Sequence, residues 1–144
     1  MVGGVVKSKL VNFLVTGVEV NYDRVGAVYD IVGSGDVDVL ARVMKSFEKA
    51  YGGLWVGGKM LLTETAVHLS ANVLNRMVQK GSLDIEIPLE LIRNVCNEGG
   101  FFTKVIRLDT DAGSVKFRCY GAKEVVALIE RYQKLHSEAV RVAG

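Results

Sequence analysis

Cysteine and histidine are scarce in this 144-residue sequence, which contains two of each. Cys96 and Cys119 are far apart, form no C-x-x-C pair and have no run of histidines near them in the sequence. A structural zinc site or a disulfide framework needs closer groups of such residues. We therefore expect no metal, no other cofactor, two reduced thiols, and structural roles for His68 and His136.

Long apolar runs are also missing. The longest one near the start, residues 10–18, is interrupted by Asn12 and Thr16, whereas a bilayer-spanning helix needs about 20 apolar residues. Lys7 and Lys9 precede this run as they would in a signal peptide, but no small-residue cleavage site follows. The sequence predicts a cytoplasmic protein without a transmembrane segment, for which peripheral contact with a membrane is one use.

Charge of one sign is concentrated nowhere in the chain. The formal net charge is +2, and the lysines and arginines are spread along the sequence. Nucleic-acid binding usually brings a basic stripe and a recognisable module, so we expect no nucleic-acid partner. Hydrophobic residues make up 49% and charged residues 24%, which predicts one domain with a substantial core.

The first 35 residues show no sustained period. Val6, Leu10, Phe13 and Leu14 fit one face of a short helix that docks on the domain or on a partner. Residues 33–36 read as a turn, so we predict an N-terminal extension over 1–35 and a domain over 36–144.

Residues 37–49 are ambiguous by pattern. A helix fits the spacing of Leu40, Val43, Met44 and Phe47, whereas a strand fits the alternation of Val37, Val39, Ala41, Val43 and Phe47.

Short strands dominate beyond residue 58. Residues 60–63 and 67–69 are apolar runs broken at Glu64 and Thr65, which predicts a tight hairpin. Ile85 and Ile87 alternate with acidic residues in a strand that Pro88 ends, because proline has no amide hydrogen to donate to a sheet. Apolar residues then recur at helical spacing over 125–139, which predicts a C-terminal amphipathic helix.

The hairpin over 102–120 admits a register from its alternation. With 111–114 as the turn, Leu108 pairs with Phe117 and Ile106 with Cys119, so that one face is apolar.

This register also sets Arg107 across from Arg118, and like charges that face each other destabilise an antiparallel pair. Either solvation helped by Asp109 and Lys116 compensates, or a bound anion bridges the two guanidinium groups. Arg107 and Arg118 are therefore candidate ligand-binding residues.

From residue 57 onward the sequence resembles the GRAM domain and the related bacterial pleckstrin-homology-like domains. The residues that carry the resemblance are the glycine and strand of 58–63, the Ile-Pro-Leu element that begins at Ile87, the strand, charged turn and strand of 107–117, and Lys123, Glu124, Leu128 and Ile129 of the last helix. The family usually has a basic and an aromatic residue where this chain has Ala66 and Leu69, which weakens any inheritance of polar interactions there.

The resemblance implies a mainly β fold, a seven-stranded, strongly bent sandwich or partly open barrel that the C-terminal amphipathic helix closes at one end. It assigns residues 37–49 to the first strand. Members of this superfold bind phosphoinositides, other lipids or proteins, and some bacterial relatives serve as assembly modules, so the fold implies a class of function and no particular ligand.

The glycine-rich stretch 52–58 holds the remaining candidates. It ends in the pattern G-x-x-x-x-G-K of a phosphate-binding loop, but Met60 replaces the required Ser or Thr and opens a strand-like run, so we reject that function. In one hypothesis Trp55 enters a membrane interface while Lys45, Lys49 and Lys59 meet anionic headgroups. In the other, Trp55 packs on its own domain or on a second subunit.

We therefore expect a non-enzymatic binding module that recognises an anionic lipid surface or a protein partner. The alternative is a structural domain that self-assembles into a homo-oligomer without a lipid ligand. An enzyme ranks third, because no nucleophile, base and orienting group can be assembled from the sequence.

Overall fold

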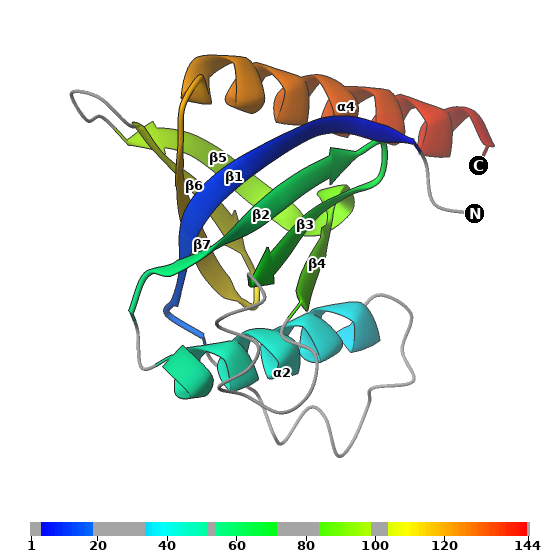
Figure 1. Ribbon diagram of the computed structural model, residues 1–144. Coiled ribbons are helices and arrows are strands. Elements are labelled where there is room, and N and C mark those ends of the chain that lie inside the picture. The colour runs from blue at the N-terminus through cyan, green and yellow to red at the C-terminus, as the bar shows by residue number, and fades with distance from the viewer. Residues whose placement is uncertain (1–3, 19–33, 52–53, 72–83, 99–103, 144) are drawn as a thin grey trace.

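A computed structural model describes residues 4–18, 34–51, 54–71, 84–98 and 104–143 (Figure 1). Its elements are β1 (Val5–Thr16), α2 (Ser34–Tyr51), β2 (Val56–Thr63), β3 (Ala66–Ala71), β4 (Asp84–Pro88), the 3-10 turn η1 (Leu89–Leu91), β5 (Ile92–Glu98), β6 (Lys104–Thr110), β7 (Gly113–Cys119) and α4 (Ala122–Ala143).

The described strands form one antiparallel sheet in the order β4-β3-β2-β1-β7-β6-β5. The sheet curls into a half-barrel, with α4 across one end and α2 across the opposite end (Figure 1). This confirms the predicted class, a mainly β half-barrel with a C-terminal helix, which is consistent with a pleckstrin-homology-like fold.

The core lies inside the curl, because alternate residues of each strand point inward. Phe13, Met60, Ile106 and Phe117 are fully buried there. Helix α4 adds Val125 and Ile129, and helix α2 adds Leu40, Met44 and Phe47.

The prediction of a strand over 37–49 is wrong, because this segment lies in α2. Leu40, Met44 and Phe47 are buried at helical spacing, whereas Val39, which an inward-facing strand would bury, is 62% exposed. The resemblance chose between two patterns that the residues themselves left open, and it chose the wrong one.

The prediction of a short helix over residues 6–14 is also wrong, because these residues belong to β1. β1 pairs with β2 on one side and with β7 on the other, and Val11, Phe13 and Val15 face the core. The predicted extension over 1–35 thus includes a central strand of the sheet. β1, and not the segment 37–49, is therefore one of the seven strands of the sheet.

The two hairpins differ in how well the sequence predicted them. The hairpin of β2 and β3, with its turn at Glu64 and Thr65, is confirmed, and so are strand β4 and the C-terminal helix.

The register predicted for β6 and β7 is wrong by two residues: Ile106 pairs with Phe117, Arg107 with Lys116 and Val105 with Arg118. The connection consists of two residues, 111 and 112, in place of the four predicted, because the Thr110 hydroxyl and Gly113 close the turn earlier. Arg107 and Arg118 do not face each other, so the bridging-anion hypothesis loses its basis.

Candidate functional site

The outer face of the three central strands carries an orderly grid of side chains. One row runs across β2, β1 and β7 and consists of Gly57, Asn12 and Arg118. In the next row, Lys59 of β2 lies opposite Leu10 of β1. Strands are about 4.8 Å apart, so the side chains within each row are immediate neighbours.

The Trp55 indole lies under the Arg118 guanidinium, whose central carbon is 4.3 Å from the ring centroid. Trp55 precedes the buried Val56, so its side chain points to the outer face, where 36% of it stays exposed. A guanidinium over an aromatic face is attracted by the ring quadrupole, and its N–H edge remains available for other acceptors. Trp55 therefore holds Arg118 in place on the surface.

The segment that carries Trp55 is anchored to the core from the other side. Phe13 stacks on Phe47 with ring centroids 5.0 Å apart, and Phe47 stacks on Tyr51 at 4.7 Å. The backbone amide of Leu54 donates to the carbonyl of Tyr51 at 3.0 Å. Leu54, which is 70% exposed, is thus held in a fixed position just after the end of α2.

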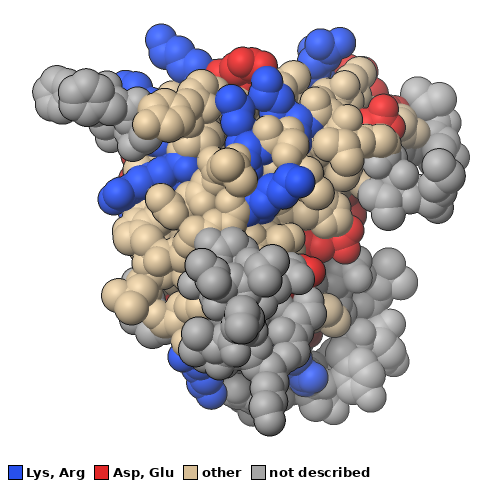
Figure 2. All heavy atoms as spheres, viewed as in Figure 1, with Lys and Arg blue, Asp and Glu red and all other residues tan. Residues whose placement is uncertain are grey.

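Exposed apolar side chains gather around Arg118. Eight large hydrophobic residues of the described chain are exposed. Three of them, Leu10, Trp55 and Tyr120, lie on or beside this grid, and a fourth, Leu54, directly precedes Trp55 in the chain. Leu10 is 84% exposed and Tyr120 71% exposed. We define the outer patch as these four residues with Lys59 and Arg118. In Figure 2, lysine and arginine side chains gather among uncharged ones over β1 and β2, below α4.

The cations of the outer patch and the cations farther along the sheet differ in their ion pairs with carboxylates. Arg107 lies 3.1 Å from Asp109 and 3.2 Å from Glu98, and Lys116 lies 3.3 Å from Glu98. Among the described residues, no carboxylate forms an ion pair with Lys59 or Arg118. The described part of the chain therefore leaves the positive charge of the outer patch without a paired carboxylate.

We call the paired charges of Glu98, Arg107, Asp109 and Lys116 the β5–β7 cluster, and the pKa of Asp109 reflects this pairing. Burial acts to raise this pKa, but hydrogen bonds from Ser114 and Asn94 and the charge of Arg107 together lower it below its ordinary value. The pKa of Arg107 is raised, chiefly by the Asp109 charge. Arg107 is held by its own domain.

The six residues predicted as ligand-binding divide into three places. Trp55, Lys59 and Arg118 meet in the outer patch. Lys45 and Lys49 lie on α2, where Lys45 pairs with Glu48 at 3.0 Å and Lys49 is exposed in the last turn. Arg107 lies in the β5–β7 cluster.

The Trp55 indole packs on Arg118 of its own domain and keeps an exposed part, and its entry into a membrane interface stays a prediction. The G-x-x-x-x-G-K stretch ends inside β2, which confirms that Met60 belongs to a strand and that no helix follows Lys59.

Leu10, Asn12 and Tyr120 were not predicted as part of any site. The signal for Leu10 and Asn12 was the alternation of Val11, Phe13 and Val15, which places the even-numbered residues on the opposite face of a strand. The helical interpretation of this segment concealed it.

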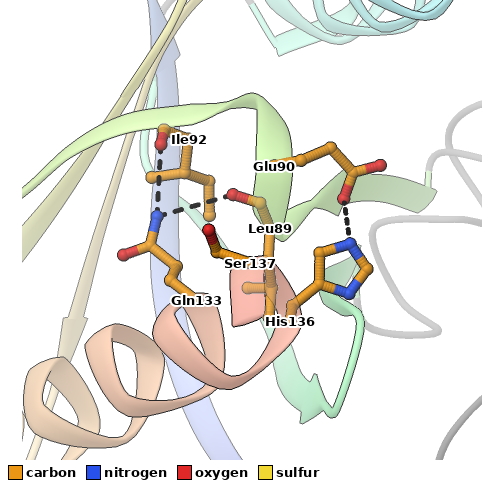
Figure 3. A pocket seen from close by; sticks show the side chains of 6 residues that line it. All are labelled: Leu89, Glu90, Ile92, Gln133, His136 and Ser137. Atoms are coloured by element: carbon orange, nitrogen blue, oxygen red, sulfur yellow. Dashed lines mark hydrogen bonds and ion pairs between the residues drawn. The ribbon is translucent and has the colours of Figure 1, made fainter. Parts of the chain in front are cut away.

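A hollow of about 550 Å³ lies apart from the outer patch, between η1, β5 and α4 (Figure 3). The Gln133 amide donates to the carbonyls of Ile92 at 3.1 Å and Leu89 at 3.5 Å, and His136 Nε2 lies 3.3 Å from a carboxylate oxygen of Glu90. Ser137 points toward the same space (Figure 3), but among the described residues no hydrogen bond joins it to His136. These contacts fasten α4 to η1, and they assemble no activated nucleophile.

Within the described ranges, no three His, Cys, Asp or Glu side chains are grouped so that they could hold a metal ion. No helix in those ranges is both long enough and apolar enough to span a bilayer.

No family model and no curated protein matches this chain. Among solved structures, it is similar to the crystal structure of the C-terminal domain of an unknown protein from Leishmania infantum, with 10% sequence identity, a TM-score of 0.46, and coverage of 90% of this chain and 84% of that one. A similarity at this level carries no argument about function. The resemblance to the GRAM domain stays a prediction.

Proposed function

We propose that this protein is a non-enzymatic module that binds the surface of an anionic membrane through the outer patch. The observation that carries the proposal is the stacked pair of Trp55 and Arg118, set between the exposed Leu10, Leu54 and Tyr120 on a face whose cations lack acidic partners among the described residues. Apolar side chains with a neighbouring positive charge fit the boundary between headgroups and acyl chains.

Two kinds of interaction should contribute to the free energy of membrane binding, and each contribution is moderate. A basic residue near an anionic leaflet contributes about 1 kcal/mol, so Lys59 and Arg118 together supply about 2 kcal/mol that salt screens. Burial of apolar surface adds about 25 cal/mol per Å², a contribution that salt does not weaken. Binding therefore needs several residues of the patch at once, and it should be reversible.

Vesicle flotation tests the proposal with phosphatidylcholine vesicles that contain or lack phosphatidylserine. We expect binding only to the anionic vesicles, weaker at high salt. Lys59→Glu reverses one charge and should weaken binding about thirtyfold, which corresponds to about 2 kcal/mol. Trp55→Ala should weaken it about tenfold, because it removes apolar surface and the support of Arg118.

Matched controls come from α4, where Leu135 and Lys134 are exposed outside the patch. Leu135→Ala and Lys134→Glu should leave flotation near the wild-type level. Wild-type protein that fails to float with anionic vesicles, or controls that lose as much binding as the patch variants, would refute membrane binding through this face.

Self-assembly is the second candidate, because the order of the described strands leaves β4 and β5 at the edges of an open sheet. An edge strand offers backbone groups for pairing with another chain. Light scattering after size exclusion separates the two functions. A stable higher oligomer whose assembly survives Trp55→Ala favours assembly through the edges, and a monomer that floats with anionic vesicles favours the membrane.

A further inference from the structure

The outer patch surrounds a hollow that forms where β1 and β7 separate. The pairing of these two strands ends at Asn12 and Arg118, whereas β1 continues beside β2 as far as Val5. The space left between them is about 330 Å³ and is lined by Leu10, Val11, Asn12, Arg118, Cys119 and Tyr120. It is much larger than one phosphate group needs, so a headgroup can enter without a change in the strands.

Two side chains of this hollow, Arg118 and Asn12, can donate hydrogen bonds to a ligand. Arg118 offers its N–H edge while Trp55 supports the face of the guanidinium at 4.3 Å, and the Asn12 amide lies beside it in the same row. A planar guanidinium held in this way forms paired hydrogen bonds with two oxygens of one phosphate, which a lysine ammonium does not. None of the residues that line the hollow carries a carboxylate.

Further positive charge acts on Cys119, which lines the hollow. Burial raises the pKa of the Cys119 thiol, and the charge of Lys9 opposes that rise. The Lys9 ammonium also lies close to Gly121, just after the end of β7. Glu124 lies near these lysines: Lys7 holds its carboxylate at 2.8 Å, and the Lys7 hydrogen bond and charge, with the charge of Lys9, lower its pKa. The lining of the hollow itself contains Arg118 and no carboxylate, so the local field favours an anion.

The rim points to a lipid as the source of that anion. Leu10 on β1 and Tyr120 after β7 flank the hollow and are the two most exposed hydrophobic side chains of the patch. A free anion gains nothing from contact with exposed apolar side chains, whereas a lipid phosphate is attached to glycerol and acyl groups that these side chains can contact.

We propose that the hollow between β1 and β7 binds the phosphomonoester headgroup of a membrane lipid, with Arg118 and Asn12 as its ligands. This inference rests on the proposed membrane function and adds a preference to it. A monoester presents three terminal oxygens, enough to accept from the guanidinium edge and the amide together. A diester headgroup presents two, flanked by its esterified groups.

Flotation with two kinds of vesicle tests this preference. One kind contains phosphatidylcholine with phosphatidic acid, the other phosphatidylcholine with phosphatidylserine, adjusted to equal surface potential. Wild-type protein should bind the phosphatidic acid vesicles about fivefold to tenfold more tightly. Arg118→Lys keeps the charge and loses the paired geometry, so it should abolish the preference while binding to phosphatidylserine changes less than twofold.

Asn12→Ala should reduce the preference in part, and Arg93→Lys, on the exposed Arg93 that pairs with Asp111 at 2.9 Å, should leave it intact. Equal binding of the wild type to both vesicles would overturn the inference and leave the proposed function standing. Absence of binding to either vesicle would overturn both.

A thermal shift with inorganic phosphate, against chloride at equal ionic strength, separates the lipid from a soluble source. Free phosphate should stabilise the wild type by at most about 1 °C at millimolar concentration, because it lacks the contacts to the rim. A shift of several degrees that Arg118→Lys removes, without any preference between the vesicles, would overturn the lipid assignment in favour of free phosphate.

Discussion

Two threonines close the hairpin turns of this sheet in the same way, and their replacement tests how the turns fix the register. Thr63 Oγ1 accepts from the amides of Thr65 at 3.2 Å and Ala66 at 3.0 Å, and donates to the Ala66 carbonyl at 3.2 Å. Thr110 Oγ1 accepts from the amides of Ala112 at 3.0 Å and Gly113 at 3.2 Å, and donates to the Gly113 carbonyl at 2.8 Å. Valine has the same shape without the hydroxyl.

The expected costs differ because the burial differs. Thr63 is 4% exposed, so Thr63→Val leaves an amide inside the protein without an acceptor. Three lost hydrogen bonds at about 1 kcal/mol each predict a loss of about 3 kcal/mol in the free energy of unfolding. Thr110 is only half-buried, so water replaces its hydroxyl and Thr110→Val should cost about 1 kcal/mol.

Urea denaturation followed by circular dichroism measures both costs. For a domain of this size, they correspond to decreases in Tm of about 6–12 °C and about 2–4 °C. Thr63→Ser, which keeps the hydroxyl, should recover most of the stability that Thr63→Val loses. The reasoning is refuted if Thr63→Val stays within about 0.5 kcal/mol of the wild type, or if Thr110→Val is the more damaging change.

Three further predictions address the close contact of two strands, the assignment of α2 and the response to acid. Gly58→Ala should cost about 3 kcal/mol, since the new Cβ would clash with the Ser70 carbonyl oxygen; near-wild-type stability in urea would contradict this approach of β2 and β3. Met44→Ala should cost about 2–5 kcal/mol, and Val39→Ala less than about 0.5 kcal/mol, because Met44 is fully buried and Val39 is 62% exposed; the reverse order would favour the strand predicted from the sequence. The lowered pKa of Asp109 means that its stabilisation is present above about pH 4 and is lost as the pH falls through the folded-state value. Asp109→Asn should therefore lose stability at neutral pH and less of it on acidification, and parallel stability profiles of the two proteins against pH would argue against this role.

The second half of the fold was predictable because local chemistry and the global arrangement agree there. The Thr63 turn lies between two apolar runs, Pro88 ends an alternating strand, and the last helix follows Gly121, whose φ of 70° suits glycine. The register of β6 and β7 was not predictable from alternation alone, because a shift of two residues keeps the same side chains on the same face. Only the threonine-closed turn distinguishes the two registers.

The first half failed for a different reason in each segment. Residues 37–49 satisfy both periods because Val39 and Val43 occupy exposed positions of α2, while other apolar residues, among them Leu40, occupy the buried ones. β1 was taken for a helix because apolar residues occur on both of its faces, which hides a period of two. The error in β1 also prevented prediction of the candidate site, because residues on β2, β1 and β7 form one patch only when β1 is a strand between the other two.

Leu10, which helped to hide β1 in the sequence, is also one of the residues that mark the surface. An antiparallel sheet with one solvated face should carry polar side chains outside, and the outer faces of β3 and β6 do so with His68, Ser70 and Arg107. Leu10 breaks that rule on β1, as Trp55 does before β2 and Tyr120 after β7. Unrelated departures would be scattered over the sheet, whereas these three surround one stacked arginine. This convergence of departures from a local rule on one place supports the proposal that this face binds something outside the fold.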